Sequence, residues 1–319
     1  MNEPSARREF AREVVSRLRQ AGYHALWAGG CVRDLILGRE PADYDVATSA
    51  TPEQVIAALP FRTIPVGISF GVVRVLSPRQ RGGDEVEVAT FRSDNAYIDG
   101  RRPSSVVFSS PEQDASRRDF TINGMFMDPE TNEVVDYVGG LDDLDRRRLR
   151  AIGDPSARFR EDKLRLLRAV RFAARFKLTI EPVTWAAIRS MARQVTVVSP
   201  ERIAQELRKM LVDENRSRAM TMALDAGLVS AIMPQAAEMR GLYQGKIIQP
   251  EGDLWDHAML VLDLLPGRPS FPLAFAAFLH DVGKPSTRAV HHGRTSFHNH
   301  EQVGGRIAER LARALKLSN

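Results

Sequence analysis

A pair of glycines set between two apolar segments constrains the fold of this chain more than any other feature of its sequence. Gly29 and Gly30 follow the apolar run of residues 25–28 and precede the apolar residues of positions 32–37. This order predicts a strand, a tight turn and the start of a helix. Glycine lets a ligand approach the backbone, helix N-termini favour anions, and Arg33 adds a positive charge. The turn therefore suits a phosphate group, although such a pair often occurs in turns that bind nothing.

Two carboxylates follow the glycine turn. Asp43 and Asp45 are two residues apart, so a strand would point both side chains to the same face. Two carboxylates together with phosphate oxygens are the ligands that Mg²⁺ prefers. An Asp-x-Asp pair by itself is also common in surface loops. After the glycine turn, however, it predicts a site that holds a nucleoside triphosphate through magnesium.

A further acidic strand is predicted at residues 85–92. Its alternation of acidic and apolar residues places Glu85 and Glu87 on one face. Glu87 is therefore a candidate third carboxylate of the metal site, and the exposed polar face of a sheet explains the alternation equally well. Residues 94–103 contain glycine, proline and several charges, which indicates a mobile loop that could close over a substrate.

The length and composition indicate a globular protein of two or three domains. The chain has 319 residues, of which 43% are hydrophobic, enough for ordinary packed cores. No stretch approaches the roughly 18 consecutive apolar residues of a membrane span, and we expect no signal peptide. The single cysteine, Cys31, allows no intramolecular disulfide, which suits the reducing cytoplasm where we expect the protein. Cys31 is predicted to be a small buried residue rather than a reactive thiol.

Basic residues are concentrated in one part of the chain. The formal net charge is only +5, but residues 146–177 contain twelve Lys or Arg against three Asp or Glu. Such a concentration predicts a polyanionic partner, either nucleic acid or nucleotide phosphates. A solvated basic face is the simplest alternative.

The hydrophobic periodicity divides the chain into three parts. Residues 1–150 combine a helix at 7–20 with short strand-like runs at 25–28, 43–47, 71–76, 86–91, 106–108 and 134–137. Helical patterns then dominate residues 151–245, at positions 163–176, 182–192, 200–212 and 216–226. Residues 246–319 form a third part, also helical. We therefore expect an α+β fold, with a mixed sheet in the head followed by two helical domains.

A short polar motif in the head gathers several groups that bind nucleotides. It reads Arg117-Arg118-Asp119-Phe-Thr-Ile-Asn123 and provides two guanidinium groups, a carboxylate and an amide. These are the groups that phosphate and ribose recognition needs. The same residues would also fit a salt-bridged strand end.

A long amphipathic helix is predicted over residues 160–176. Asp162 and Arg165 are three residues apart and would be neighbours on one side of this helix. A carboxylate beside a guanidinium offers an acceptor and donors to the Watson–Crick edge of a base, so the pair could select a nucleotide without a template strand. An ordinary ion pair within a helix is the alternative.

Taken in order, these motifs resemble those of the class II tRNA nucleotidyltransferases, the family of the CCA-adding enzymes and bacterial poly(A) polymerases. The matching segments are Gly29-Gly-Cys-Val-Arg33-Asp34 with Asp43-Tyr-Asp45, then residues 117–123, then Glu161-Asp162-x-x-Arg165-x-x-Arg168-Ala-x-Arg171. They cover most of residues 20–240. Gly124 departs from the family, which usually has alanine after the asparagine. The resemblance implies a polymerase-β-type nucleotidyltransferase head followed by helical neck and body regions.

The resemblance also implies a role for each matching residue. Asp43 and Asp45, with Glu87 as a third catalytic candidate, would bind Mg²⁺ in a site of the two-metal type. The nucleotide would be bound by Gly29, Gly30, Arg33, Arg117, Arg118, Asp119, Asn123, Asp162, Arg165, Arg168 and Arg171. Asp162 and Arg165 would read the base.

The implied reaction is attack of the tRNA 3′-hydroxyl on the α-phosphorus of CTP or ATP, with release of pyrophosphate. The implied partners are the tRNA 3′ end, CTP and ATP. Complete CCA addition, addition of A alone, addition of CC alone and poly(A) synthesis share these motifs. The loop at 94–103 weighs against a CC-adding enzyme, because members of that kind tend to lack a functional loop there. The sequence does not predict the oligomeric state.

The third part of the chain resembles the HD phosphohydrolase domain through His257, His280, Asp281 and His300. Imidazole nitrogens beside a carboxylate suit a transition metal. Such a domain usually has a further downstream aspartate, for which this chain offers no obvious candidate, so we expect a truncated domain. A metal-dependent hydrolase as the main activity would leave the head unexplained. A catalytically silent RNA-binding protein would leave the carboxylates after the glycine turn unexplained.

Overall fold

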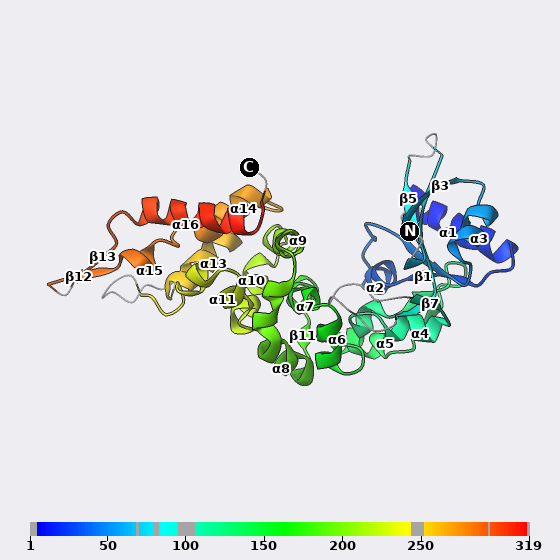
Figure 1. The fold of residues 1–319 in the computed structure, drawn as a ribbon, viewed down its shortest axis with the longest axis horizontal. Helices are drawn as coiled ribbons and strands as arrows, with labels where there is room; N and C mark the ends of the chain where they lie inside the picture. The colour runs from blue at the N-terminus through cyan, green and yellow to red at the C-terminus, as the bar shows by residue number, and fades with distance from the viewer. Residues whose placement is uncertain are drawn as a thin grey trace. The chain divides into compact units, whose positions relative to one another are not determined.

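The computed structural model describes residues 5–67, 70–78, 83–94, 106–243, 252–292 and 294–317. The chain divides into two compact units, Met1–Glu161 and Asp162–Asn319. The first unit contains a mixed sheet with several helices, and the second is mainly helical (Figure 1). The predicted α+β class is therefore confirmed. The predicted domain boundaries at residues 150 and 245 stay predictions, and the second of them lies outside the described residues.

The first unit alternates short strands with short helices along most of its length. Its elements are α1 (Ala6–Gln20), β1 (Ala25–Ala28), α2 (Gly30–Ile36), β2 (Asp45–Thr48), α3 (Pro52–Ala58), β3 (Arg62–Gly67), β4 (Val72–Leu76), β5 (Glu85–Thr90), β6 (Arg92–Asp94), β7 (Val106–Phe108), α4 (Pro111–Ser116), the 3₁₀ turn η3 (Thr121–Asn123), β8 (Phe126–Met127), β9 (Val134–Val135), α5 (Gly140–Asp145), β10 (Arg148–Leu149) and α6 (Pro155–Glu161). The predicted loop at 94–103 falls almost entirely on residues 95–105, which lie outside the described residues.

A seven-stranded sheet forms the centre of this unit, in the order β3-β4-β5-β2-β1-β8-β9. β2 and β5 run parallel, and the other neighbouring pairs are antiparallel. The parallel register places Asp45 of β2 directly opposite Glu87 of β5. Residues that face each other across neighbouring strands point to the same side of a sheet. Two acidic side chains from distant parts of the sequence therefore meet on one face.

The alternation predicted for the acidic strand matches its burial. In β5, Val86 and Val88 are fully buried, whereas Glu85 and Glu87 are exposed. The helix predicted at residues 7–20 is α1, which buries Phe10, Ala11, Val14, Val15 and Leu18 and contacts β1 and β2. Its first turn is capped by Ser5, whose side chain accepts a hydrogen bond from the N–H of Arg8. One face of the sheet is thus covered while the acidic row stays accessible.

A buried cluster anchors the ends of β1 and α4. Its members are Leu26, Ala28, Ala47, Phe91, Ala115 and Phe126. The rings of Phe91 and Phe126 meet edge to face with their centroids 5.8 Å apart. The glycine turn leaves β1 at Ala28, and the Arg117-Arg118 pair follows α4 closely. The same core therefore fixes the positions of both motifs.

The second unit is built almost entirely of helices. Its elements are α7 (Leu164–Arg175), β11 (Thr179–Ile180), α8 (Pro182–Met191), the 3₁₀ segment η4 (Ala192–Val197), α9 (Pro200–Leu211), α10 (Arg216–Asp225), α11 (Leu228–Ile232), α12 (Pro234–Ala237), α13 (Leu254–Leu264), α14 (Phe271–Leu279), α15 (Lys284–Thr287), β12 (Ala289–His291), β13 (Arg294–Ser296) and α16 (His300–Ala314). The four predicted helical segments correspond to α7, α8, α9 and α10. Proline stands in the first turn of α8 and α9, where its missing N–H has no intrahelical partner to lose.

One predicted helix is interrupted. Residues 160–176 do not form a single helix, because α6 ends at Glu161 and α7 begins at Leu164. The Oδ1 atom of Asp162 accepts a hydrogen bond from the backbone N–H of Leu164 at 3.0 Å. Aspartate satisfies the first N–H groups of many helices in this way. Asp162 and Arg165 therefore lie at the start of α7 and not within one long helix.

Candidate active site

The glycine turn has a backbone conformation that favours glycine. Gly29 has a φ of +72°, and its N–H donates to the carbonyl of Met125 at 3.0 Å. A Cβ atom on Gly29 would lie 2.6 Å from Nη1 of Arg118. The backbone conformation therefore favours glycine here, and any larger residue would also displace the guanidinium of Arg118. α2 starts directly afterwards at Gly30, and Cys31 is buried, as predicted.

Arg33 links the glycine turn to the motif that ends at Asn123. Its side chain is buried; Nη1 donates to Oδ1 of Asn123, while Nε and Nη2 donate to Asp34 at 2.9 and 2.6 Å. Nδ2 of Asn123 donates in turn to Oδ1 of Asp119 at 3.0 Å. Arg33 and Asn123 are 90 residues apart in the sequence. Three of the predicted nucleotide-binding residues are therefore joined in one hydrogen-bonded network with Gly29 and Gly30 beside it.

The side chain of Asp45 lies in an environment rich in negative charge. The pKa of Asp45 is raised to about 6, mainly because surrounding protein atoms hinder hydration of its carboxylate. The carboxylates of Glu87 and Asp43 raise this pKa further, and the positive charge of Arg118 partly opposes them. Such a group is a good ligand for a cation, since a bound cation would offset both effects.

The three candidate metal ligands are not equally close. Asp45 and Glu87 face each other across β2 and β5, whereas the side chain of Asp43 is 84% exposed and lies 3.7 Å from Nη1 of Arg7. Glu87 lies 3.7 Å from Nη2 of Arg74, which is opposite it on β4. In the described part of the chain, the oxygens of the three carboxylates do not all come within 4.8 Å of one another. The chemistry of the donors fits Mg²⁺, and an ion would have to draw Asp43 inward.

The Arg117-Arg118 pair shares a carboxylate that the sequence analysis missed. Asp114 is 1% exposed and forms ion pairs with Arg117 at 2.6 Å and with Arg118 at 2.9 Å. Burial alone would raise the pKa of Asp114, but the charges of Arg118 and Arg117 hold it below its usual range. The spacing of three and four residues between these groups was the available signal. The guanidinium of Arg118 also lies over the ring of Phe126, 5.1 Å from its centroid.

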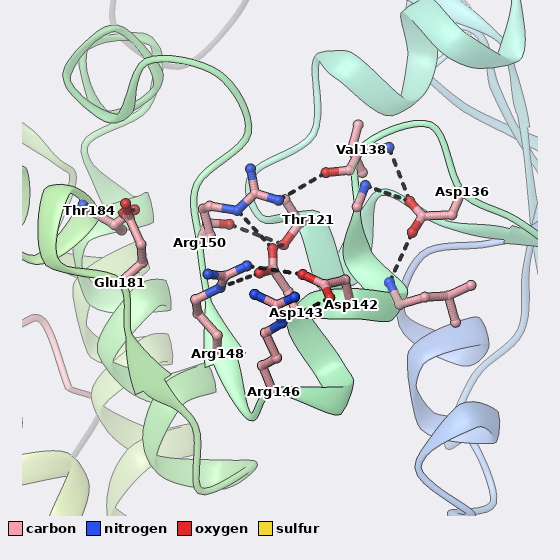
Figure 2. Close-up of polar contacts among 12 residues, drawn as sticks. Thr121, Asp136, Val138, Asp142, Asp143, Arg146, Arg148, Arg150, Glu181 and Thr184 are labelled. Atoms are coloured by element: carbon pink, nitrogen blue, oxygen red, sulfur yellow. Dashed lines mark hydrogen bonds and ion pairs between the residues drawn. The ribbon is translucent and has the colours of Figure 1, made fainter.

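A second carboxylate network supports the turn that contains Asn123, and it was also missed. Asp143 is fully buried and accepts hydrogen bonds from Oγ1 of Thr121 at 2.6 Å and from Nε of Arg150 at 2.9 Å, with Nε of Arg148 on its other oxygen (Figure 2). Figure 2 also shows Asp136, which accepts from three backbone N–H groups at the start of α5. Thr121, the first residue of η3, is therefore held by Asp143 of α5 and by the backbone carbonyl of Arg150, which follows β10.

The second unit contains the predicted base-reading residues. Asp162 forms a two-pronged ion pair with Arg202 of α9, with N–O distances of 3.2 and 2.7 Å. Arg165 follows at the start of α7, and its backbone N–H donates to the carbonyl of Asp162 at 3.0 Å. The two predicted residues are therefore adjacent, and Arg202 is an additional partner that sequence spacing did not indicate.

Two further arginines of α7 were predicted to bind the nucleotide. The guanidinium of Arg168 lies over the ring of Phe172, 5.0 Å from its centroid. Arg171 is 6% exposed, lies over the same ring at 4.1 Å, and pairs with Glu206 of α9 at 2.5 Å. The structure therefore places Arg171 in a buried ion pair that joins α7 to α9, and its contact with a nucleotide stays a prediction.

The histidines of the second unit form a compact cluster. Nε2 of His280 lies 3.3 Å from Nε2 of His257 and 3.2 Å from Oδ2 of Asp281. Burial alone would raise the pKa of Asp281, but hydrogen bonds from His280 and Lys284 hold it well below its usual range. Among the described residues, His257, His280 and Asp281 form the group of three whose ligand atoms lie within 4.8 Å of one another. His300 is adjacent, 3.6 Å from Oδ1 of Asp281.

Two family models match the chain. A model described as a poly(A) polymerase head domain matches residues 25–150, and one described as a probable RNA- and SrmB-binding site of polymerase A matches residues 177–239. The first match covers the glycine turn, the acidic strands and the Arg117-Arg118 motif. The second falls within the helical unit.

Proteins similar to this chain in sequence or in structure include CCA-adding enzymes. That of Levilactobacillus brevis is 45% identical over 221 residues, which are 69% of this chain and 54% of the relative. That of Lactobacillus gasseri is 39% identical over 268 residues, or 82% of this chain and 66% of the relative. A crystal structure of the Bacillus stearothermophilus CCA-adding enzyme in complex with CTP has a TM-score of 0.67 and 30% identity, and covers 97% of this chain and 69% of that one. The chain spans about half the length of the first of these relatives.

A mixed sheet with a glycine turn close to paired carboxylates, matched by the poly(A) polymerase head, defines the class as nucleotidyltransferases. The chain belongs to the class II tRNA nucleotidyltransferase and poly(A) polymerase family, as its motifs predict. Within the described residues, no helix combines the length and the apolar character needed to span a membrane.

Proposed function

We propose that this protein adds CMP and AMP, taken from CTP and ATP, to the 3′ end of tRNA without a template and releases pyrophosphate. The observation that carries the proposal is the pairing of Asp45 with Glu87 close to the glycine turn, in a chain whose relatives are CCA-adding enzymes. The similar Bacillus stearothermophilus enzyme was crystallised with CTP, which supports a pyrimidine triphosphate as one substrate. The cytoplasmic location stays a prediction.

Asp43, Asp45 and Glu87 are proposed to hold Mg²⁺ ions. Bound Mg²⁺ would lower the proton affinity of the attacking hydroxyl and stabilise charge on the leaving pyrophosphate. The raised pKa of Asp45 supports this assignment, because it reflects a carboxylate shielded from water and placed beside the charges of Glu87 and Asp43, and a bound cation would offset both effects. Asp43 would exchange its contact with Arg7 for the ion. Glu87 then either completes the ligand set or accepts the proton of the hydroxyl.

The triphosphate is proposed to lie on the glycine turn. Arg118 is favoured over Arg117 as the arginine that contacts it, because Arg118 approaches Gly29 closely. Arg117 instead directs Nε to the carbonyl of Arg92 at 3.1 Å. Gly30 and Arg33 are proposed to complete the phosphate site.

The ribose is proposed to bind beside the hydrogen-bonded pair of Asp119 and Asn123. A carboxylate and an amide at fixed positions can accept from and donate to a sugar hydroxyl. Arg33 holds Asn123 from the other side. These hydrogen bonds among Arg33, Asn123 and Asp119 support recognition of the sugar at this place.

Asp162 and Arg165 are proposed to select cytosine and adenine. Both bases present an exocyclic amino group next to a ring nitrogen that accepts a hydrogen bond, so a carboxylate and a guanidinium suit both. Uracil presents a carbonyl and an N–H at the same places, which would face the wrong partners. Arg202 fixes the Asp162 carboxylate through both oxygens. Because Oδ1 also accepts from the N–H of Leu164, Oδ2 is the oxygen that retains a further lone pair for the base.

A primer-extension experiment tests the proposal. We would compare tRNA ending at the discriminator base with tRNA ending in CC, each given CTP, ATP or both. A CCA-adding enzyme completes the first substrate only with both nucleotides and the second with ATP alone. An A-adding enzyme extends only the second substrate, a CC-adding enzyme stops after two C, and a poly(A) polymerase adds a long A tail.

Variants of the metal site provide the control for this experiment. The D43A/D45A double variant should not extend any substrate, whereas exchange of Asp142, an exposed acid of α5, for asparagine should leave extension intact. Extension by D43A/D45A at the wild-type rate would show that the metal assignment is wrong. Absence of incorporation by the wild-type protein on every substrate would refute nucleotide addition itself.

The histidine cluster favours a second candidate function, binding of a transition metal for phosphohydrolase chemistry. His257, His280 and Asp281 offer two imidazole nitrogens and a carboxylate in ligand range of one another. Metal analysis after purification with Mn, Ni or Fe should detect bound metal in the wild type and little in H257A/H280A. H298A is the matched control, because His298 is an exposed histidine outside this cluster. Equal metal content in all three proteins would refute the site.

A further inference from the structure

One buried carboxylate holds both arginines of the Arg117-Arg118 pair. Oδ1 of Asp114 accepts from Nε and Nη2 of Arg117 at 2.9 and 2.6 Å. Oδ2 accepts from Nε and Nη2 of Arg118 at 3.2 and 2.9 Å. The backbone N–H of Arg92 also donates to Oδ1 at 3.3 Å. Each oxygen of this carboxylate therefore serves a different arginine.

The two arginines leave Asp114 in different directions. Arg117 reaches the backbone of Arg92, which begins β6. Arg118 donates through Nη1 to the carbonyl of Asn123 at 3.2 Å, and the same Nη1 lies 2.6 Å from the position of a Cβ on Gly29. Only Arg118 is thus directed at the turn where the triphosphate is proposed to lie.

Arg118 also lies within electrostatic range of the metal-site carboxylates. Its charge acts on Asp45, yet among the described residues its ion pair is made with Asp114 and not with Asp45. A guanidinium without a fixed partner would be attracted to the exposed acidic row of Asp45 and Glu87 whenever no metal is bound. The buried carboxylate of Asp114 disfavours that alternative. If Arg118 moved away from Asp114, it would leave a buried negative charge with one ion-pair partner fewer, which is costly.

We propose that Asp114 is a positioning residue that keeps Arg118 directed at the triphosphate and away from the metal-site carboxylates. The inference rests on the proposed function, since it requires a nucleotide on the glycine turn. Asp114 itself touches no substrate and acts through Arg118. Its effect should therefore depend on the phosphates of the ligand and not on the base or the ribose.

Equilibrium binding of CTP, CMP and cytidine, with Mg²⁺ present and tRNA absent, tests this inference. The D114N variant keeps the size of the side chain but turns one acceptor oxygen into a donor. It should bind CTP on the order of tenfold more weakly than the wild type, because a charged carboxylate no longer orients the Arg118 guanidinium. Binding of cytidine should be unchanged, and binding of CMP should change only slightly.

A double-mutant cycle distinguishes this positioning role from a merely structural one. If Asp114 acts through Arg118, the D114N/R118K protein should bind CTP no more weakly than the weaker single variant. The D142N variant is the control for independent effects, because Asp142 is an exposed acid of α5 that pairs with Arg146 and Arg148, and its effect on CTP binding should multiply with that of D114N. Equal weakening for CTP and cytidine, or independent effects of D114N and R118K, would overturn the inference.

The D114E variant covers the case in which D114N does not fold. It retains the charge that the two arginines need but displaces the carboxylate by one methylene, so CTP binding should again weaken while cytidine binding does not. Wild-type affinity for CTP in D114E, or in a folded D114N, contradicts the positioning role while leaving nucleotide addition intact. If the wild type neither binds CTP nor extends tRNA, the proposed function fails first, and the inference fails with it.

Discussion

Exchange of Asp143 for asparagine removes the charge from a fully buried group that supports the nucleotide motif. Asp143 accepts from Thr121, Arg148 and Arg150, and two of these three hydrogen bonds are ion pairs with arginine. Loss of one partner of a buried ion pair typically costs about 3–5 kcal/mol, and each charge-assisted hydrogen bond about 1.5–3 kcal/mol. Because Arg148 and Arg150 are 31% and 36% exposed and can be rehydrated, we expect the lower end, about 3 kcal/mol.

Urea unfolding of D143N and D142N measures this cost against a matched control. Asp142 is the neighbouring acid of α5, is 51% exposed, and pairs with Arg146 and Arg148 at the surface. Exposed ion pairs contribute about 0–1 kcal/mol, so D142N should unfold almost like the wild type. In D143N we also expect a higher KM for CTP with a smaller change in kcat, because Thr121 begins the turn that ends at Asn123. A free energy of unfolding for D143N within about 1 kcal/mol of that for D142N would refute the reasoning.

Three further predictions concern the glycine turn and its surroundings. The pKa of Asp45 is raised to about 6, so folding of the metal-free protein favours the protonated carboxyl. This contribution to the free energy of unfolding is complete below about pH 4 and is lost as the pH rises through about 6. Thermal unfolding in EDTA should therefore show the D45N variant gaining stability relative to the wild type across this range. Burial raises the pKa of the Cys31 thiol to about 12, so a thiol reagent at pH 8 should label native protein far more slowly than urea-unfolded protein. The G29A variant should lose about 1–3 kcal/mol in urea unfolding and bind CTP more weakly, since its methyl group would displace Arg118; unchanged CTP affinity would count against the position of the triphosphate.

Features with a strong local signal were predictable from the sequence. The alternation of acidic and apolar residues in 85–90 indicated which face of β5 is buried, because a strand has a period of two. The glycine pair indicated the turn between β1 and α2. Gly29 has a φ of +72°, and residues other than glycine rarely adopt such a conformation. The helical spacing of residues 7–20 likewise predicted α1 within one residue of its start. In each case the physical cause lies within a few neighbouring residues.

Partnerships between distant residues were not predictable in the same way. Nothing in the polar sequence of α4 indicates that Asp114 is buried, and Asp143 stands among other acids of α5 that remain exposed. The Asp162–Arg202 and Arg171–Glu206 pairs each join α9 to residues 35 or 40 positions earlier, a distance at which spacing carries no information. The break between α6 and α7 was missed for a related reason. The amphipathic periodicity continues through Asp162, whereas its side chain accepts a hydrogen bond from the backbone N–H of Leu164, the first residue of α7.

The placement of these carboxylates has a consequence for metal binding as well as for nucleotide binding. A site that holds both Mg²⁺ and a triphosphate needs acids and arginines close together, and opposite charges in such a site tend to neutralise each other. In the described structure Arg33 is paired with Asp34 and Arg118 with Asp114, so neither arginine is drawn into an ion pair with Asp45. Glu87 faces Arg74 at the longer distance of 3.7 Å. Release of Arg118 in D114N should therefore weaken Mg²⁺ binding in the absence of nucleotide, which calorimetric titration can measure. R117K should bind Mg²⁺ as the wild type does, because Arg117 extends toward β6. Wild-type Mg²⁺ affinity in D114N would mean that a released Arg118 does not compete for the metal-site carboxylates.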